Sequence, residues 1–366
     1  MDAAAGLNSP VRPGDPPARI VTVREPAVGL EAIVVIDHFL FPASAGGTRL
    51  APDVSEAEIV ALARAMTWKF AVYQLPVAGA KAGIRFAGGD RQAVLRAFLA
   101  AIEPWGESFL TGPDLGTSAE DFLGPGEAGG ERPLWARTHD GLGMDDLATG
   151  HGVKAGAEAA LERLGRGLEG ATIAIEGFGK VGAGTARACT RAGARIVGVS
   201  TIEGALLAPD GLDVAELLEL RARHGDALVH HGPVATAPRE ALFATPCDVL
   251  VPGARPHVIT PGLAATLPCA VVAPGANIPY AKGADEALHA RGIVALPDFV
   301  TNAGGVHLYE SPDCRTDPIS CLEAIERRVA ATTARVLEAA AAASITPISA
   351  ALRLAGEYLE RAAREA

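Results

Sequence analysis

The sequence is short of aromatic residues, of long uncharged runs and of lysine. Phe, Trp and Tyr make up 5% of its 366 residues, whereas 49% are hydrophobic and 20% charged. This composition is typical of folded α/β or α-rich proteins rather than of disordered chains. The longest uncharged run, 258–281, contains four prolines, which exclude a transmembrane helix there. The amino terminus has neither the cationic start nor the apolar run of a secretory signal, so we predict a cytoplasmic protein without membrane contact.

The cysteines and charges narrow the class of ligand. The five cysteines are odd in number and form no Cys-x-x-Cys pair, which argues against a disulfide framework and a structural zinc site. The nine histidines show no metal-ligand spacing, and we predict no metal. Acidic residues exceed basic ones by 43 to 32, for a net charge of −11. Without a basic cluster, this balance excludes a broad nucleic-acid surface, so we expect a small-molecule ligand.

The hydrophobic pattern predicts an α/β first part. Ser55 is placed to cap a helix, and Glu58 stands where a capping box requires an acid. The spacing of apolar residues and the turn signals predict the rest: strands at 20–23 and 32–36, helices at 55–69 and 91–102, and an exposed loop at 124–133.

From about residue 145 the pattern alternates between helices and short buried strands. Such alternation predicts a parallel, doubly wound sheet with right-handed crossovers. The tail from Pro318 is predicted helical, with a break near Pro347. The predicted elements of the sheet are a helix at 145–164, strands at 172–176 and 195–199 with a helix between them through 189, and strands at 248–251, 270–273 and 293–296.

A glycine-rich turn follows the strand at 172–176 and opens a helix. In this context the pattern G-x-G-x-x-G predicts a Rossmann dinucleotide site, where glycines allow a tight turn, close approach of the pyrophosphate and close helix packing. The alternative is a tight strand–helix turn without a ligand, which the further strands disfavour. The predicted residues are Gly177, Phe178, Gly179, Lys180, Val181 and Gly182.

The next strand does not choose between NAD and NADP. An acid at its end would bind the ribose hydroxyls and a nearby arginine would accept a 2′-phosphate, but the strand ends at Ser200 and Thr201 with no arginine close behind. We interpret Glu203 as an exposed turn residue. The sequence therefore predicts NAD or NADP, used with weak selectivity, with Thr201 at the cofactor.

Lysine is scarce, with five lysines among the 32 Lys and Arg residues. A desolvated lysine can lose its proton, which arginine cannot, so lysines in apolar segments are candidate acid–base groups. Lys69 and Lys81 share one Ala- and Gly-rich segment, 66–84. A single lysine of this kind is more often a solvated surface cation, but two in one apolar stretch favour a functional role.

This segment resembles the signature of the glutamate/leucine/phenylalanine/valine dehydrogenase family, M-T-x-K-x-A followed by P-x-G-G-x-K-G-G. Ala78 and Ala82 replace glycines of that signature, Pro113 is unusual in its block, and His151 replaces a common tyrosine. The resemblance covers nearly the whole chain through six further blocks in order: 42–49, 111–117, 148–153, 247–253, 273–277 and 297–305.

The resemblance implies catalytic roles for Lys81 and Asp114, with Lys69 binding the substrate α-carboxylate. Hydride would leave the substrate Cα for the nicotinamide, giving an iminium ion that water attacks. Burial and cationic surroundings would lower the pKa of Lys81, so that it could activate that water at about pH 7–8. Asp114 would move protons to and from the amino group. The resemblance further implies three residues beside the cofactor: Thr149, Asn277 and Asn302.

The same resemblance predicts a neutral substrate. Glutamate-specific members carry a lysine where this chain has Ala45, and a buried carboxylate without a cation would be costly unless Arg49 or another group compensates. The substrate-binding residues implied are Ala45, Gly46, Gly47, Lys69, Gly112, Asn302, Val306 and Tyr309.

The sequence thus predicts an NAD(P)-dependent amino acid dehydrogenase that reversibly deaminates a neutral L-amino acid to a 2-oxo acid and ammonia. The alternatives are a glutamate dehydrogenase with a nonstandard carboxylate partner and a noncatalytic dinucleotide-sensing homologue. The expected architecture is a substrate-binding and oligomerisation domain, 1–144 plus 330–366, and a Rossmann-type cofactor domain, 145–329. The resemblance also implies a homo-oligomer, a dimer or larger.

Overall fold

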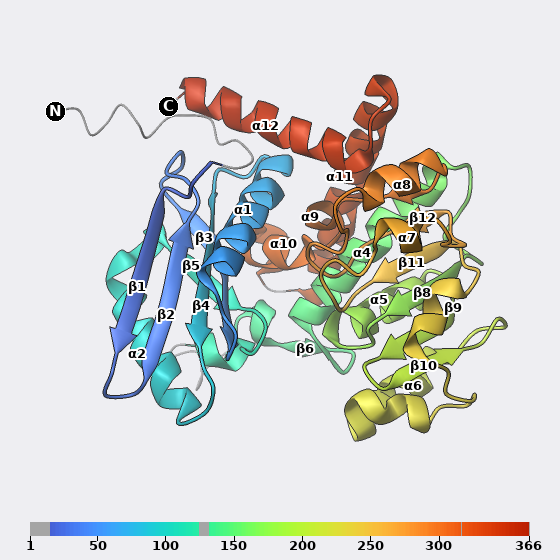
Figure 1. The fold of residues 1–366 in the computed structure, drawn as a ribbon, viewed down its shortest axis with the longest axis horizontal. Coiled ribbons are helices and arrows are strands. Elements are labelled where there is room, and N and C mark those ends of the chain that lie inside the picture. The colour runs from blue at the N-terminus through green and yellow to red at the C-terminus, as the bar shows by residue number, and fades with distance from the viewer. Residues whose placement is uncertain (1–14, 124–131, 316, 366) are drawn as a thin grey trace. The chain divides into compact units, whose positions relative to one another are not determined.

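The computed structural model describes residues 15–123, 132–315 and 317–365, shown in Figure 1. Most of the predicted loop at 124–133 therefore lies outside the described residues. The chain divides into two compact units, one formed by Met1–Arg132 with Leu352–Ala366 and the other by Pro133–Ala351. Each unit has its own sheet.

The first unit is built on a five-stranded mixed sheet of order β1-β2-β4-β3-β5. The predicted pairing of the first two strands is confirmed, because β1 and β2 are antiparallel with Val21 opposite Val34. β2 and β4 are also antiparallel, whereas β3 lies parallel to both β4 and β5. The strands are β1 (Arg19–Glu25), β2 (Leu30–Ile36), β3 (Ser44–Ala51), β4 (Ala78–Arg85) and β5 (Leu110–Pro113).

Helix α2 (Arg91–Ile102) closes one core of this unit and has the bounds that the sequence predicts. Asp90 caps it by accepting from the backbone N–H of Ala93. Phe98 is fully buried in the core that α2 shares with β2 and β4, and burying a side chain of this size contributes about 1.5–3 kcal/mol. Short 3₁₀ turns, η1 (Glu103–Ser108) and η2 (Ala119–Phe122), flank β5.

Helix α1 (Glu56–Val72) begins after Ser55 as predicted, but its first turn does not form a full capping box. The Ser55 hydroxyl accepts from the backbone N–H of Glu58, which satisfies one free donor of the first turn. The Glu58 carboxylate instead forms an ion pair with Arg49 on β3. A charged partner within reach thus replaces the backbone bond that the sequence pattern predicts.

Strand β4 carries the Ala- and Gly-rich signature and was not predicted as a strand. Its first seven residues are buried, because it lies between β2 and β3 and is covered by α1. Alanine and glycine have low strand propensity, so the local residue pattern does not predict this strand. Their small size fits a strand that is covered on its faces and paired on both edges.

The second unit contains a six-stranded sheet of order β10-β9-β8-β11-β12-β13. Every neighbouring pair is parallel except β10 with β9, which confirms the predicted doubly wound fold class. The antiparallel β10 was not predicted. The strands are β8 (Thr172–Glu176), β9 (Arg195–Thr201), β10 (Gly204–Leu207), β11 (Val249–Pro252), β12 (Val271–Val272) and β13 (Val294–Ala295), with a small β6 (Thr138–His139) and β7 (Leu142–Gly143) hairpin before them.

Helices connect and cover these strands. The predicted helices before and after β8 are present as α4 and α5, and the tail forms two helices as predicted. The helices are α4 (Met144–Arg163), α5 (Lys180–Arg191), α6 (Val214–His224), α7 (Pro261–Ala264), α8 (Ala284–Ala290), α9 (Asp298–Thr301), α10 (Gly304–Glu310), α11 (Pro318–Ala343) and α12 (Pro347–Glu365), and the 3₁₀ turns are η3 (Leu134–Ala136), η4 (Gly225–His230), η5 (Arg239–Ala244) and η6 (Pro312–Cys314).

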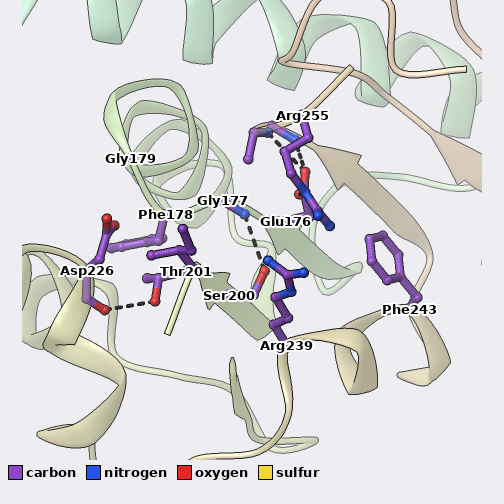
Figure 2. A pocket seen from close by; sticks show the side chains of 13 residues that line it. Glu176, Gly177, Phe178, Gly179, Ser200, Thr201, Asp226, Arg239, Phe243 and Arg255 are labelled. Atoms are coloured by element: carbon purple, nitrogen blue, oxygen red, sulfur yellow. Dashed lines mark hydrogen bonds and ion pairs between the residues drawn. The ribbon is translucent and has the colours of Figure 1, made fainter. Parts of the chain in front are cut away.

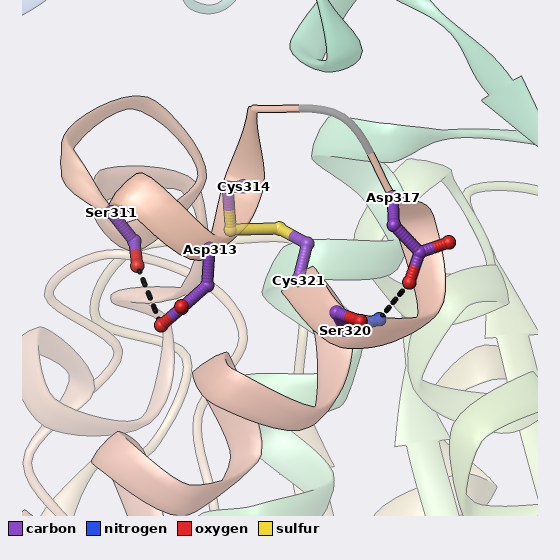
Figure 3. Close-up of a disulfide and its surroundings, with 6 residues drawn as sticks. All are labelled: Ser311, Asp313, Cys314, Asp317, Ser320 and Cys321. Carbon is purple, nitrogen blue, oxygen red and sulfur yellow. Dashed lines mark hydrogen bonds between the residues drawn. A yellow bond between two sulfur atoms is a disulfide. The ribbon is translucent and has the colours of Figure 1, made fainter.

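A disulfide joins Cys314 to Cys321 (Figure 3), so the argument against disulfides from the cysteine count and spacing is wrong for two of the five cysteines. The turn η6 and the first turn of α11 bring the two Cα atoms to 4.4 Å, within the range that a disulfide spans. Asp317 caps α11 between them by accepting from the N–H of Ser320. A spacing of seven residues across such a turn has no signature in the sequence.

Among the described residues, no single helix is long and apolar enough to cross a membrane, although the bent pair α11 and α12 taken together has the length and composition for it. In the described part of the chain, no three His, Cys, Asp or Glu side chains are grouped so that they could hold a metal ion.

Candidate functional site

The first unit brings Lys81 and Asp114 together. Lys81 lies in the middle of β4 and Asp114 follows the last residue of β5. The Nζ atom of Lys81 is 2.9 Å from Oδ2 of Asp114, and the lysine as a whole is only 5% exposed. The two residues named as catalytic from the family resemblance are therefore direct partners, at a distance that allows a proton to pass between them.

Arg49 completes this cluster from β3. Its Nε lies 3.3 Å from the same Oδ2 atom of Asp114, and its guanidinium also pairs with Glu58. The cationic surroundings predicted for Lys81 are therefore incomplete, because the Asp114 carboxylate contacts its ammonium group directly and Arg49 contacts the same carboxylate oxygen. Because Arg49 already has two acidic partners, it is poorly placed to serve as the cation for a substrate side chain.

The cluster holds Asp114 as an anion. Burial alone would raise the pKa of the Asp114 carboxyl, but the Lys81 ammonium and the Arg49 guanidinium lower it to about 2. The backbone N–H of Asp114 donates to the Thr117 hydroxyl at 2.8 Å, and that hydroxyl donates to the carbonyl of Thr48 at 2.9 Å. Sequence reasoning missed Thr48 and Thr117, which fix the turn that presents the carboxylate.

Gly47 gives the pair the space to meet. It lies on β3 opposite Gly112 of β5, on the same face as Ala45 and Arg49. A Cβ at position 47 would lie 3.0 Å from Cβ of Asp114 and 3.4 Å from Nζ of Lys81. The neighbouring Gly46 faces the other way and would strike the carbonyl of Ala80.

We predict that Gly47→Ala lowers kcat at least tenfold while dinucleotide binding stays within about twofold. The added methyl group would press on Asp114 and the Pro113 carbonyl, 2.9 Å away, and misplacement of a reacting group by a fraction of an ångström is costly. Steady-state kinetics and calorimetric cofactor binding would check this. Unchanged kcat in a folded Gly47→Ala protein would contradict the assigned packing.

A buried network fixes α1, which carries Lys69, against the sheet. The Asp37 carboxylate at the end of β2 accepts from Nε of Arg64 at 2.7 Å and from the Thr67 hydroxyl at 2.5 Å, both on α1. The backbone N–H of Asp37 donates to the carbonyl of Gly79 on β4. Lys69 is buried on this helix. The network therefore sets where Lys69 lies relative to the strand of Lys81.

The second unit contains the predicted glycine-rich turn between β8 and α5. Gly177 has φ +90°, in the region that favours glycine, and the N–H of Phe178 donates to the carbonyl of Ser200. A Cβ at Gly182 would lie 1.9 Å from the carbonyl oxygen of Gly177, whereas one at Gly179 would meet no atom within 4 Å. The turn thus packs tightly where helix meets strand and is open at its centre, which fits a dinucleotide pyrophosphate at the start of α5. Lys180 and Val181 form the first turn of that helix.

A cavity of about 300 Å³ adjoins this turn (Figure 2). The predicted Gly177, Phe178, Gly179 and Thr201 line it together with Ser200. The Thr201 hydroxyl donates to the carbonyl of Asp226 at 2.8 Å. Glu203 is not part of the wall and pairs with His230. Sequence reasoning missed Glu176, which directly precedes the turn, and four wall side chains that lie far along the chain: Asp226, Arg239, Phe243 and Arg255.

The remaining predicted residues gather around α4, α9 and α10 of the same unit. Nδ2 of Asn302 donates to Oδ1 of Asn277 at 2.9 Å, and its own Oδ1 is buried without a partner among the described residues. A Cβ at Gly305 would lie 3.8 Å from the Thr149 hydroxyl. Val306 and Tyr309 follow on α10, where the Tyr309 ring lies 5.5 Å from the ring of Trp135. Trp135 was not predicted as a site residue.

The predicted residues thus form two groups, one in each unit. The first unit holds Ala45, Gly46, Gly47, Lys69, Lys81, Gly112 and Asp114. The second holds Thr149, Gly177, Phe178, Gly179, Lys180, Val181, Gly182, Thr201, Asn277, Asn302, Val306 and Tyr309.

Comparison with known proteins identifies the family. The family model described as Glutamate/Leucine/Phenylalanine/Valine dehydrogenase matches residues 141–365, and the dimerisation domain of the same family matches residues 17–123. The chain belongs to the Glu/Leu/Phe/Val dehydrogenase family. The match to the dimerisation domain lies within the first unit, whereas the longer match covers most of the second unit and continues into the carboxyl-terminal residues that belong to the first.

Curated relatives of this family member are glutamate dehydrogenases. The NADP-specific glutamate dehydrogenase of Saccharolobus shibatae is 32% identical over 288 residues, covering 71% of the chain and 65% of that relative. The glutamate dehydrogenase of Thermotoga maritima is 34% identical over 292 residues, covering 71% and 67%. The matched part of the chain therefore spans about two thirds of the length of these relatives.

Solved structures extend the likeness to the whole fold. The hetero-hexameric glutamate dehydrogenase of Thermus thermophilus, in a Leu-bound form, superposes with a TM-score of 0.81 at 27% identity, covering 95% of the chain and 90% of that structure. The L-tryptophan dehydrogenase of Nostoc punctiforme shares the fold with a TM-score of 0.67 at 22% identity, covering 94% and 96%.

Proposed function

We propose that the protein catalyses the NAD(P)-dependent, reversible oxidative deamination of a neutral L-amino acid to the 2-oxo acid and ammonia. The observation that carries this proposal is the buried Lys81–Asp114 pair, 2.9 Å apart, in a chain whose second unit has a dinucleotide-type turn. The family, which is one of amino acid dehydrogenases, supports the same reaction class. The buried Lys81–Asp114 pair also disfavours a noncatalytic dinucleotide sensor, because a sensor does not need an acid–base pair.

In this proposal the dinucleotide, held at the glycine-rich turn, supplies the hydride acceptor. Lys69 binds the substrate carboxylate, and Asn277 and Asn302 line the nicotinamide or substrate side. Asp114 is anionic at neutral pH because its pKa is about 2, so its Oδ2 attracts the substrate ammonium group and receives its proton. Nζ of Lys81, which contacts the same oxygen, orients the water that attacks the iminium carbon, and the proton that this water loses passes along the Lys81–Asp114 pair to the departing amino group.

The proposal of a neutral substrate rests on the charges near β3. Ala45 offers no cation, and Arg49 is engaged by both Asp114 and Glu58. A substrate carboxylate placed there would lose its hydration without gaining a free partner, at a cost of several kcal/mol. In the second unit, the predicted substrate residue Tyr309 lies against Trp135, and neither ring supplies a cation for a substrate carboxylate.

The names of the curated relatives favour glutamate as the second candidate, and a substrate panel separates the two. We predict that kcat/KM for the best of leucine, valine and phenylalanine exceeds that for glutamate by at least about 100-fold, which is 2.7 kcal/mol of transition-state discrimination. Initial rates of reduced-dinucleotide formation, with each amino acid under one condition, would check this. A preference for glutamate would overturn the neutral-substrate proposal and leave the reaction class intact.

We further propose that the protein works as a homo-oligomer in the cytoplasm. The match to the family's dimerisation domain supports assembly through residues 17–123. The partner is then a second copy of this chain, and the number of copies is measurable by light scattering.

A further inference from the structure

The cavity beside the glycine-rich turn carries four charged side chains that sequence reasoning did not place there. Glu176 is buried and accepts from the N–H groups of Gly253 and Ala254, at 3.2 and 3.0 Å. It also pairs with Nε of Arg255 at 3.3 Å. Glu176 and Arg255 therefore largely neutralise each other and fix the loop after β11. The charges that remain to act on a ligand belong to Arg239 and Asp226.

Arg239 presents a guanidinium to this cavity. It begins η5 after Pro238, and Figure 2 shows it reaching into the cavity wall from a segment different from that of Arg255. Its Nε contacts Oε1 of Glu240 at 2.6 Å, which fixes one edge of the group. Its side chain remains 38% exposed, and its two terminal amino groups form no hydrogen bond or ion pair with the described residues. A guanidinium in this state suits bidentate binding of a phosphate.

Asp226, in η4, lines the same cavity. Its backbone carbonyl accepts from the hydroxyl of Thr201, at the end of β9, and the residue is exposed. Its carboxylate forms no ion pair with the described residues. A carboxylate near the end of this strand suits the ribose hydroxyls and repels a phosphate on the ribose. The contact of its backbone carbonyl with Thr201 holds Asp226 beside the strand end that lacks an acid at Ser200 and Thr201.

We propose that Arg239 is the residue that accepts the 2′-phosphate of NADP(H), and that Asp226 opposes it, so that this pair sets the ratio of NADP to NAD use. The inference rests on the proposed dehydrogenase function and names its coenzyme determinants. Chain topology explains why these two residues could not be predicted from the sequence. Arg239 lies 38 residues after Thr201, but Ala237 pairs with Ala205 of β10, which returns the chain to the end of β9.

The test is binding of two nucleotides that differ only in the phosphate concerned, adenosine 2′,5′-bisphosphate and adenosine 5′-monophosphate. Calorimetry on the full chain needs no amino acid substrate and no turnover. Arg239→Gln should weaken bisphosphate binding at least tenfold, which is about 1.4 kcal/mol, and change monophosphate binding less than threefold. Arg239→Lys should retain part of the affinity, and Asp226→Asn should strengthen bisphosphate binding about threefold or more.

Arg223→Gln is the matched control. Arg223 is an exposed arginine of the same unit that pairs with Glu219, as Arg239 pairs with Glu240, but it does not line the cavity. It should leave both affinities unchanged. Equal weakening of both nucleotides in Arg239→Gln, no weakening of either, or a wild-type protein that does not prefer the bisphosphate over the monophosphate would each overturn the assignment.

Turnover then separates this inference from the function on which it rests. In an active enzyme, Arg239→Gln should lower the ratio of kcat/KM for NADP to that for NAD at least tenfold. If no amino acid supports turnover but the nucleotide results hold, the proposed function fails and the phosphate site stands. If turnover is normal and the ratio does not move, the reverse is true.

Discussion

Replacing Lys81 by alanine should lower kcat of amino acid oxidation by about 10²–10⁴-fold, the contribution typical of a positioned acid–base group. The ammonium group is buried and lies 2.9 Å from Asp114, and no other lysine occurs on β4. Asp114 keeps Arg49 as its partner in the variant, so the carboxylate stays paired and the fold should persist. Steady-state kinetics give the loss, and calorimetric dinucleotide binding, expected to stay within about twofold, shows that the second unit is intact.

Arg85→Ala supplies the control on the same strand. Arg85 is the exposed last residue of β4 and pairs with Glu31 at 3.1 Å. Its removal deletes one cation from β4 without touching the Asp114 cluster, so kcat should stay within about twofold. Turnover near the wild-type level in a folded Lys81→Ala protein would remove the acid–base role of Lys81.

Asp114→Asn should also lower kcat by about 10²–10⁴-fold, because asparagine cannot accept the proton of the substrate amino group. This variant should in addition change the acid stability of the protein. The Asp114 pKa falls from its ordinary 3.8 to about 2 in the folded chain, so the unfolded state binds the proton more tightly. Wild-type Asp114 therefore contributes about 2 kcal/mol above pH 4, and the contribution is lost as the pH falls from about 4 to about 2.

Denaturant unfolding of both proteins between pH 7 and pH 2 measures this effect. The free energy of unfolding of Asp114→Asn should lie below that of the wild type at neutral pH, and the difference should shrink in acid. Asp121→Asn is the control, because Asp121 has a lowered pKa through its pairing with Arg91 but belongs to η2 outside the Lys81 cluster. It should lose stability with little change in kcat, and a comparable loss of kcat would show that the fall in Asp114→Asn reflects stability alone.

Local patterns in the sequence predicted the elements whose signals are strong. The helix Arg91–Ile102 was predicted with its observed bounds, because Asp90 caps it and its apolar residues recur at helical spacing. The strand Thr172–Glu176 and its glycine turn were predicted because five residues, a turn and a helix form one recognisable unit. The parallel sheet followed from the alternation of such units.

Features that depend on residues distant in the sequence could not be predicted in this way. Lys81 and Asp114 were predicted as catalytic residues only from the family resemblance, and their direct pairing joins positions that are 33 apart in the sequence. The capture of Glu58 by Arg49 and the arrival of Arg239 at the end of β9 each depend on strand pairing. The disulfide depends on a turn that has no sequence signature. In every case the local sequence allows several partners, and tertiary geometry selects one.

The most direct measurement of the central claim is the stoichiometry of products from a neutral amino acid. With leucine, valine or phenylalanine as substrate, the wild-type protein should form reduced dinucleotide, ammonia and 2-oxo acid in equal amounts, and Lys81→Ala should form all three at a rate lowered by about 10²-fold or more. Reduced dinucleotide without matching ammonia, or no product from any amino acid in the panel, would contradict the account.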